Sequence, residues 1–360
     1  MARYGDQGRQ RLVENSSRHP GTRVVVTGAT GNVGTSVVRA LAADPGIGSV
    51  LGLARRKPAL EIPKVEWDTV DLSRADNEDR LAGLLRGADT VVHLAWRFQP
   101  THDPVVTWQS NVLGSQRVFE AAARSGASAL VHASSVGAYS PGPKDEPGVD
   151  EEWPTHGWPD AAYCREKAYL ERVLDTFELR HPQIRVVRMR PGFLFKETSA
   201  PEQRRIFAGR YAPGPLLRPD LLPFVPDLPG LRFQVLHTDD AADAYRLAVL
   251  RDVRGPFNLA ADPVIDAHKL AELLGARIVR FPRALVRTVL AAAWRAHAVP
   301  ASPHLFDAVL RLPVLDSGRA RDVLGWQPAR TAEDALNAFL RGVRTGAGEN
   351  TAPLAGRKIG

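Results

Sequence analysis

Cysteine is almost absent from this chain, which has one, Cys164, among 360 residues. A single cysteine excludes an internal disulfide and any zinc site built from several thiolates. It fits a reducing compartment, so we expect a cytoplasmic protein. No apolar run is long enough to span a membrane, and no spacing of His, Asp and Glu indicates a metal site.

Two terminal segments lack the apolar residues that a core requires. Residues 1–21 are polar and charged and contain no apolar stretch of the kind that directs export. Residues 342–360 have a similar composition. We expect both segments to be disordered tails.

Acidic residues are outnumbered by basic ones, 40 to 47, which gives a net charge of +7. A positive balance can indicate a nucleic-acid partner, but here the arginines are scattered and no basic block is interleaved with aromatics. The sequence therefore favours a solvated arginine-rich surface, with some arginines serving a phosphorylated cofactor, and no nucleic-acid partner.

Apolar strands alternate with amphipathic helices from Thr22 to Phe195. This alternation predicts an α/β fold, a doubly wound (Rossmann) parallel sheet with helices on both faces, within an NAD(P)-binding domain at 22–195. The strand ends then share one edge, where ligands bind in such folds. The expected strands are Val24–Thr27, Val50–Leu53, Thr90–Leu94, Ala129–Ala133 and Arg185–Met189, and the expected helices include Ser36–Ala43, Asn111–Arg124 and Ala162–Arg180.

Beyond Phe195 the composition changes, and prolines recur from Pro213 to Pro229, a pattern that suggests a binding loop or lid. We assign 196–232 and 263–341 to a smaller C-terminal substrate lobe, with return segments to the main domain near 233–262. Within that lobe, Ala284–Ala298 is rich in alanine and leucine. Packing on the lobe or a dimer contact is favoured there over a membrane-surface helix, because the charges are few.

A glycine-rich turn carries the strongest signal, since it joins the apolar run Val24–Val26 directly to a helical pattern. This layout places the pyrophosphate of a dinucleotide at a helix N-terminus. Gly28 would allow the tight turn, Gly31 the approach of phosphate, and Gly34 close packing of helix on strand. The predicted cofactor-binding residues of the turn are Gly28, Thr30, Gly31, Asn32, Val33 and Gly34.

The end of the next strand bears on which dinucleotide binds. An acidic residue about 20 positions after the glycine motif would hold the 2′-hydroxyl of NAD. Ala54 stands there instead, followed by Arg55 and Arg56. Arginine pairs well with a 2′-phosphate, so NADP is favoured over NAD. The alternative is that both arginines are surface residues beside the adenine.

Tyr163 and Lys167 are four residues apart, on one face of a predicted helix. A phenol is a poor proton carrier at neutral pH unless a nearby ammonium lowers its pKa. Ser135, at the end of a predicted strand, could orient a carbonyl or carbinol oxygen towards Tyr163. The same edge of the sheet carries Pro191.

These residues together resemble the extended short-chain dehydrogenase/reductase superfamily, in its NAD-dependent epimerase/dehydratase branch. The resemblance runs from about Thr22 to Arg341. It implies that Tyr163 is the acid/base, Lys167 its electrostatic partner and ribose ligand, and Ser135 the substrate orienter. Asn111 would support the proton-relay geometry. Further landmarks, which the resemblance places at the cofactor or late in the fold, are Asp71-Leu72, Leu94-Ala95, Arg190-Pro191-Gly192, His237–Ala242, Asp316–Ala320 and Leu324–Trp326.

One departure from the family limits the reaction. Dehydratases of this branch carry acidic residues just after the active-site serine or threonine, and this chain has Val136 and Gly137, which cannot transfer a proton. The sequence therefore favours an NAD(P)-dependent oxidoreductase acting on a secondary alcohol or ketone of a small molecule. The alternatives are a sugar-nucleotide epimerase with tightly bound NAD and a non-catalytic NADP-binding redox sensor. The resemblance is also compatible with a homodimer.

Overall fold

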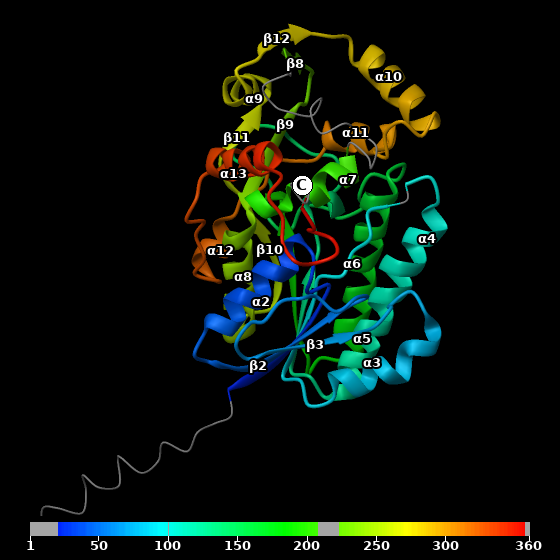
Figure 1. Cartoon of the computed structure of the whole chain (residues 1–360), viewed down its shortest axis with the longest axis vertical. Coiled ribbons are helices and arrows are strands. Elements are labelled where there is room, and N and C mark those ends of the chain that lie inside the picture. The colour runs from blue at the N-terminus through cyan, green and yellow to red at the C-terminus, as the bar shows by residue number, and fades with distance from the viewer. Residues whose placement is uncertain (1–20, 100, 208–222, 357–360) are drawn as a thin grey trace, which may run out of the picture.

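The structure, a computed structural model, describes residues 21–99, 101–207 and 223–356. Most of the first expected tail, residues 208–222 and the last residues 357–360 lie outside the described residues. The first part of the proline-rich stretch, 213–222, therefore lies outside them, and the second part contains strand β8 (Phe224–Asp227). Figure 1 shows one large sheet with helices in the lower part of the molecule and smaller sheets in an upper lobe. Among the described helices, none is long and apolar enough to cross a membrane.

The main sheet has seven strands in the order β10-β6-β5-β4-β1-β2-β3, and all neighbours pair in parallel. This arrangement confirms the expected Rossmann sheet. The strand order reverses between β1 and β4, which is where ligands bind in doubly wound folds. The strands are β1 (Thr22–Thr27), β2 (Ile47–Ala54), β3 (Val65–Thr69), β4 (Thr90–His93), β5 (Ala129–Ala133), β6 (Arg185–Pro191) and β10 (Gly255–Leu259).

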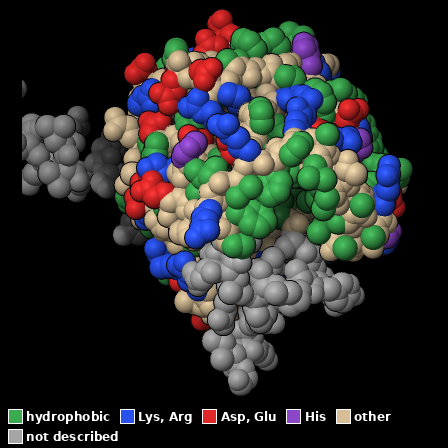
Figure 2. All heavy atoms as spheres, turned by 90° about the horizontal axis from the view of Figure 1, so that it is seen from above, with side chains coloured by type: hydrophobic (Ala, Val, Ile, Leu, Met, Phe, Trp, Pro, Cys, Tyr) green, Lys and Arg blue, Asp and Glu red, His purple; other side chains and the backbone are tan. Residues whose placement is uncertain are grey.

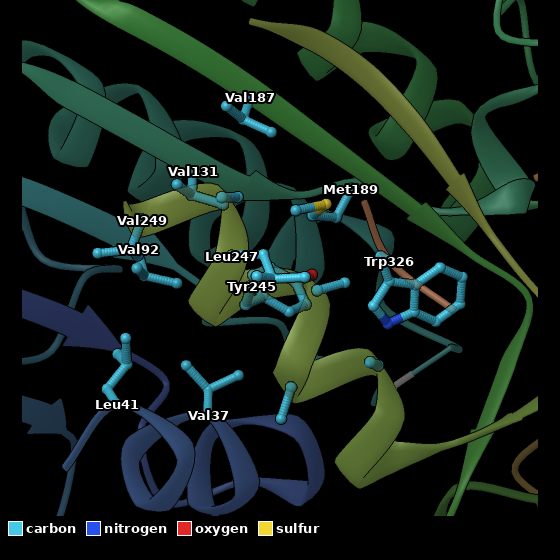
Figure 3. Close-up of a cluster of buried hydrophobic side chains, with 14 of the residues drawn as sticks. Val37, Leu41, Val92, Val131, Val187, Met189, Tyr245, Leu247, Val249 and Trp326 are labelled. Carbon is cyan, nitrogen blue, oxygen red and sulfur yellow. The ribbon is translucent and has the colours of Figure 1, made fainter. Parts of the chain in front are cut away.

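Helices cover both faces of this sheet. Successive strand residues point to opposite faces, so each strand presents apolar side chains to the helices on both sides. Val24 and Val26 pack on one side with α2 (Asn32–Ala43) and α8 (Thr238–Leu250). Figure 3 shows Val37 and Leu41 of α2 and Tyr245 of α8 within this cluster. Val25 packs on the other side, in the cluster formed with α3 (Glu78–Leu85), α5 (Gly114–Ser125) and α6 (Ala162–Arg180).

The upper lobe holds a three-stranded sheet, β11-β9-β7, and a two-stranded sheet, β12-β8. Its strands are β7 (Phe193–Phe195), β8 (Phe224–Asp227), β9 (Arg232–His237), β11 (Ala261–Asp266) and β12 (Arg277–Arg280). The helices of this part are α7 (Ala200–Phe207), α9 (Ala267–Leu274), α10 (Arg283–Arg295), α11 (Pro303–Val309) and α13 (Ala332–Thr345), whereas the short α12 (Gly318–Asp322) packs on the main sheet through Ala320. Of the segment 233–262, only β10 returns to the main sheet as a strand, since β9 lies in the smaller sheet.

Short helical turns connect these elements, and several of them carry residues of the predicted site. They are η1 (Ala75–Asn77), α4 (Pro104–Trp108), η2 (Gln109–Leu113), η3 (Val136–Ala138) and η4 (Glu197–Ser199). The helix expected at Asn111–Arg124 therefore begins as α5 at Gly114, and Asn111 lies in the π-helical turn η2 before it.

The expected disordered tail from 342 onward is wrong for the residues that the structure describes. Helix α13 continues to Thr345, and residues 346–356 then fold back onto the main domain (Figure 1). Leu354 is fully buried, and the Thr351 hydroxyl donates a hydrogen bond to the carbonyl oxygen of Thr30. A few long-range contacts order a segment that has no apolar run of its own.

Candidate cofactor and catalytic site

The turn after β1 is shaped by two glycines that no other residue could replace without movement. Gly28 has a φ of +68°, and a Cβ there would lie 2.6 Å from the Ala95 nitrogen. A Cβ on Gly34 would lie 2.2 Å from the Gly28 carbonyl oxygen. Gly31 differs, because its Cβ would meet nothing closer than 3.6 Å, which leaves the backbone there open to a ligand.

An acidic side chain lies at the N-terminus of α2, where the sequence predicts a pyrophosphate. The Asn32 backbone N–H donates to Glu202 Oε2 at 3.0 Å. Burial raises the pKa of Glu202, while this hydrogen bond acts in the opposite direction. A carboxylate oxygen on the first N–H groups of a helix marks an anion site, and the turn therefore fits the phosphates of a dinucleotide.

The C-terminal strap, residues 347–356, covers the same turn. Besides the bond from Thr351 to Thr30, the Arg205 side chain donates to the Pro353 carbonyl oxygen. Glu349 pairs with Lys196 at 3.0 Å and with Arg39 of α2 at 2.9 Å. Burial alone would raise the pKa of Glu349, but the bond from Arg39 and the charge of Lys196 lower it to about 2.

Arg55 and Arg56 follow β2 directly, and both are exposed. No hydrogen bond or ion pair engages either side chain among the described residues. Arg56 lies close enough to Arg205 to lower the pKa of that guanidinium, after the larger effect of burial. The end of β2 is therefore a cationic region next to the glycine turn, as a phosphate-binding site requires.

Other predicted cofactor residues follow the ends of neighbouring strands. Asp71 and Leu72 come after β3, and Asp71 accepts hydrogen bonds from the Ser73 backbone and hydroxyl. Leu94 and Ala95 follow β4, and Pro191 is the last residue of β6. Thr30 and Asn32 are buried in the turn, and Val33 is the second residue of α2. The structure thus brings these residues to one edge of the main sheet.

Tyr163 and Lys167 lie one turn apart on α6, as the spacing predicts. The Lys167 Nζ atom donates to the Ala133 carbonyl oxygen at 2.6 Å and lies 6.0 Å from the centroid of the Tyr163 ring. Burial lowers the pKa of Lys167 to about 7, although Glu166 and Glu171 act to raise it. This lysine is therefore poised to change charge near neutral pH.

Tyr163 is enclosed by aromatic side chains from the loop after β4. Phe98 stacks on its ring with centroids 5.1 Å apart, and Trp96 meets it edge-on at 5.6 Å. Burial raises the pKa of Tyr163, and an interaction with the Ser135 hydroxyl lowers it by less. The expected lowering by Lys167 is not found in this arrangement, since the ammonium group is held by Ala133 and Trp96 instead.

Ser135 lies two residues beyond the end of β5 and caps η3, where its hydroxyl accepts a hydrogen bond from the Gly137 N–H at 3.0 Å. A Cβ on Gly137 would lie 2.6 Å from Tyr163 Cε1. An acidic side chain could not occupy that position without displacing the tyrosine. The steric contact adds a physical reason to the sequence argument against dehydratase chemistry.

The Asn111 side chain is engaged in hydrogen bonds to other protein groups, unlike the side chain of a residue that is free to relay a proton. Its side chain accepts from the Arg97 N–H at 2.7 Å and donates to the Arg97 carbonyl oxygen at 2.9 Å and to Glu166 Oε2 at 2.7 Å. It therefore fixes the loop that carries Trp96 and Phe98. Sequence reasoning missed Glu166, although a carboxylate directly before the lysine was the available signal.

The remaining candidate residues, one cysteine and two histidines, are buried in the interior of the protein. Cys164 is fully buried, and burial raises the pKa of its thiol to about 12. His93 contacts the hydroxyls of Thr27 and Ser115. His132 lies beside it with neither ring nitrogen hydrogen-bonded to a described residue. No cluster of three metal-ligating side chains occurs in the part of the chain that the structure covers.

The fold is of the Rossmann class, and the site at the edge of its sheet has a shape and charge that fit a dinucleotide. The model of the NAD dependent epimerase/dehydratase family matches residues 24–260. The chain belongs to this family.

Several proteins resemble this chain over most of its length. An uncharacterized protein of Mycobacterium tuberculosis is 25% identical over 327 residues, which are 89% of this chain and 83% of the relative. The solved UDP-glucose 4-epimerase of Thermus thermophilus, in complex with NAD, covers 90% of this chain and 99% of its own at 20% identity, with a TM-score of 0.65. A shorter match, 36% over 112 residues, joins 31% of this chain to 40% of the L-arabinose 1-dehydrogenase (NAD(P)(+)) of Haloferax volcanii.

Proposed function

We propose that this protein is an NAD(P)-dependent oxidoreductase that interconverts a secondary alcohol and a ketone. The observation that carries the proposal is the grouping of Ser135, Tyr163 and Lys167 at the edge of the sheet that also bears the glycine turn. When bound, the dinucleotide supplies a carbon that accepts or donates the hydride. The likeness to a dehydrogenase over part of the chain supports the same reaction class.

Each residue then has a separate task. The Tyr163 hydroxyl transfers the proton of the substrate oxygen, and the Ser135 hydroxyl holds that oxygen by a hydrogen bond. Lys167 stabilises the phenolate electrostatically when its ammonium turns towards the ring. Asn111 keeps the loop of Trp96 and Phe98 in place, so that this loop closes the site above Tyr163.

NADP is the dinucleotide that the charges favour. Arg55 and Arg56 are exposed at the end of β2 and make no hydrogen bond or ion pair among the described residues, although, against the effect of burial, the charge of Arg55 helps to lower the pKa of Asp71. A 2′-phosphate would pair with them, whereas Ala54 offers no carboxylate to a free ribose hydroxyl. Calorimetric titration with NADP and NAD tests this preference, which we expect to be lost in Arg55→Gln/Arg56→Gln.

The decisive test of the oxidoreductase is Tyr163→Phe. The variant should bind the dinucleotide with unchanged affinity in calorimetry while turnover of a ketone or alcohol substrate falls about 10²–10⁴-fold. Lys167→Met serves as a companion, because it should weaken both turnover and cofactor binding. A Tyr163→Phe enzyme with full turnover would refute the proposal. If neither the unaltered protein nor Tyr163→Phe showed turnover, and both bound a partner protein equally well, the redox sensor would be favoured.

The C-terminal strap favours a second candidate, an epimerase that retains its NAD. A strap over the glycine turn would slow release of a bound dinucleotide, and epimerases return the hydride to the same substrate. Protein purified with dinucleotide still bound, which interconverts UDP-sugars without net change in nicotinamide absorbance, would establish this alternative.

A further inference from the structure

Helix α10 turns Arg283 and Arg287 towards the protein, and Leu285 and Val289 towards solvent. Arg283 and Arg287 bond to the carboxylate of Asp307 on α11 at 2.9 and 2.6 Å. Leu285 and Val289, one turn apart on the opposite side, are 52% and 61% exposed. None of the helix residues is buried. The lobe packing that the sequence favours here is therefore limited to the arginine side of the helix.

Strand β12 continues this apolar surface. Ile278 and Val279 are 38% and 37% exposed, between Arg277 and Arg280. We call these four residues, together with Leu285, Val289 and Arg295, the crest. β12 and α10 lie at the same end of the molecule, the end farthest from β2 and β3 (Figure 1). Figure 2 views the molecule from this end and shows hydrophobic and basic side chains next to one another.

Basic side chains outnumber acidic ones in this region. Between Glu272 and Asp307 the sequence contains five arginines and no acidic residue. Asp227 of β8 faces the crest from outside that stretch, 3.3 Å from Arg280, whose side chain is 92% exposed. Apolar side chains that face outward among arginines are the combination by which peripheral proteins bind membranes.

We propose that the crest binds the surface of an anionic lipid bilayer. Leu285 and Val289 would enter the boundary between headgroups and acyl chains, together with the one of Ile278 and Val279 that lies on the bilayer side of β12, since neighbouring strand residues point to opposite faces. Arg277, Arg280 and Arg295 would meet lipid phosphates. A second copy of the chain fits less well, because two crests would bring arginines against arginines. The proposal does not depend on the oxidoreductase activity.

Flotation of the full chain with vesicles tests it, using phosphatidylcholine with about one third phosphatidylglycerol, against phosphatidylcholine alone. We expect binding to the anionic vesicles only, weakened by salt. Leu285→Asp/Val289→Asp should abolish it. The matched control is Leu179→Asp on α6, which is 83% exposed outside the crest and should bind normally. Arg277→Gln/Arg280→Gln should bind about fivefold more weakly for each arginine removed.

Three outcomes would overturn the proposal. The first is no binding by the unaltered chain, and the second is equal loss in Leu179→Asp. The third is concentration-dependent dimerisation in sedimentation velocity that Leu285→Asp/Val289→Asp removes, without vesicle binding, which would make the crest an interface between copies. The unfolding temperature of each variant identifies any that fail to fold, and the arginine variant then decides.

Discussion

The indole ring of Trp96 lies over the ammonium group of Lys167, with 3.5 Å between Nζ and the ring centroid. The family resemblance assigns the same ammonium group to a ribose. We therefore expect a dinucleotide that binds in the proposed manner to displace the indole.

Trp96 should report this movement. Addition of NADP is expected to change the tryptophan fluorescence of the unaltered protein, and Trp96→Phe should lose most of the change. Trp96→Ala should also bind NADP more tightly, by about 0.5–2 kcal/mol, because no cation–π contact has to be broken. Trp108→Phe, which alters an indole packed on Tyr169, is the control. Equal signals from both Phe variants would show that Trp96 stays in place.

Glu202 should compete with the phosphates of the dinucleotide. Glu202→Gln removes the negative charge at the N-terminus of α2, and we expect NADP affinity to rise about fivefold, as for a charge removed from a helix end. Glu197→Gln, whose carboxylate pairs with Arg341 instead, should leave the affinity unchanged in the same calorimetric titration. Reduced affinity in Glu202→Gln would mean that the carboxylate aids binding.

Gly137→Ala should damage the site through one methyl group. The added Cβ would lie 2.6 Å from Tyr163 Cε1, so the tyrosine or η3 must shift. We expect turnover to fall at least tenfold, with an unfolding free energy lower by about 1–3 kcal/mol. Gly83→Ala, at a helical position with open space around it, should instead be stabilising by up to about 1 kcal/mol. Chemical denaturation measures the unfolding free energy of both variants, and a turnover assay measures the activity of Gly137→Ala.

The charge of Lys167 should depend on its neighbour Glu166. Burial lowers the pKa of Lys167 to about 7 while Glu166 raises it, so Glu166→Gln should move the titration to lower pH. Spectra of protein carrying 13C-labelled lysine follow this titration directly. Glu120→Gln on α5, which removes an exposed carboxylate paired with Arg180, should leave it unaltered. An upward shift in Glu166→Gln would contradict the assignment.

Glu171 should make stability depend on pH in the acid range. Burial would raise its pKa, but Arg190 and Arg188 lower it to about 2, below the ordinary value of 4.5. Its contribution is therefore fully present above pH 4.5 and is lost as the pH falls to about 2. Glu171→Gln should cost about 3–5 kcal/mol at neutral pH and flatten this acid limb in denaturant titrations. If stability were lost at acid pH to the same extent in Glu171→Gln, other carboxylates would be responsible for that loss.

Local patterns in the sequence were enough for the inner strands of the main sheet and for α6, whose observed bounds are those predicted. Strand β3 was missed because Val65–Thr69 alternates charged residues with apolar ones at the edge of the sheet, where one side stays exposed. The apolar runs of β1, β4 and β5 lie inside the sheet and are therefore easier to detect.

Only the parts of the site that lie within a single sequence motif could be predicted from the sequence. The glycine turn and the Tyr163–Lys167 pair are each encoded within a few residues. The ring of Trp96 over Lys167 and the clamp of Asn111 on Glu166 join residues 71 and 55 positions apart. Contacts of this kind depend on how two loops and a helix meet, and no local pattern specifies that.

The bond between Thr351 and Thr30 joins residues 321 positions apart. The glycine turn is therefore translated long before its cover, and the main sheet that supports the turn is complete once β10 has been made. The strap is translated after both, so it can close over a turn that is already folded.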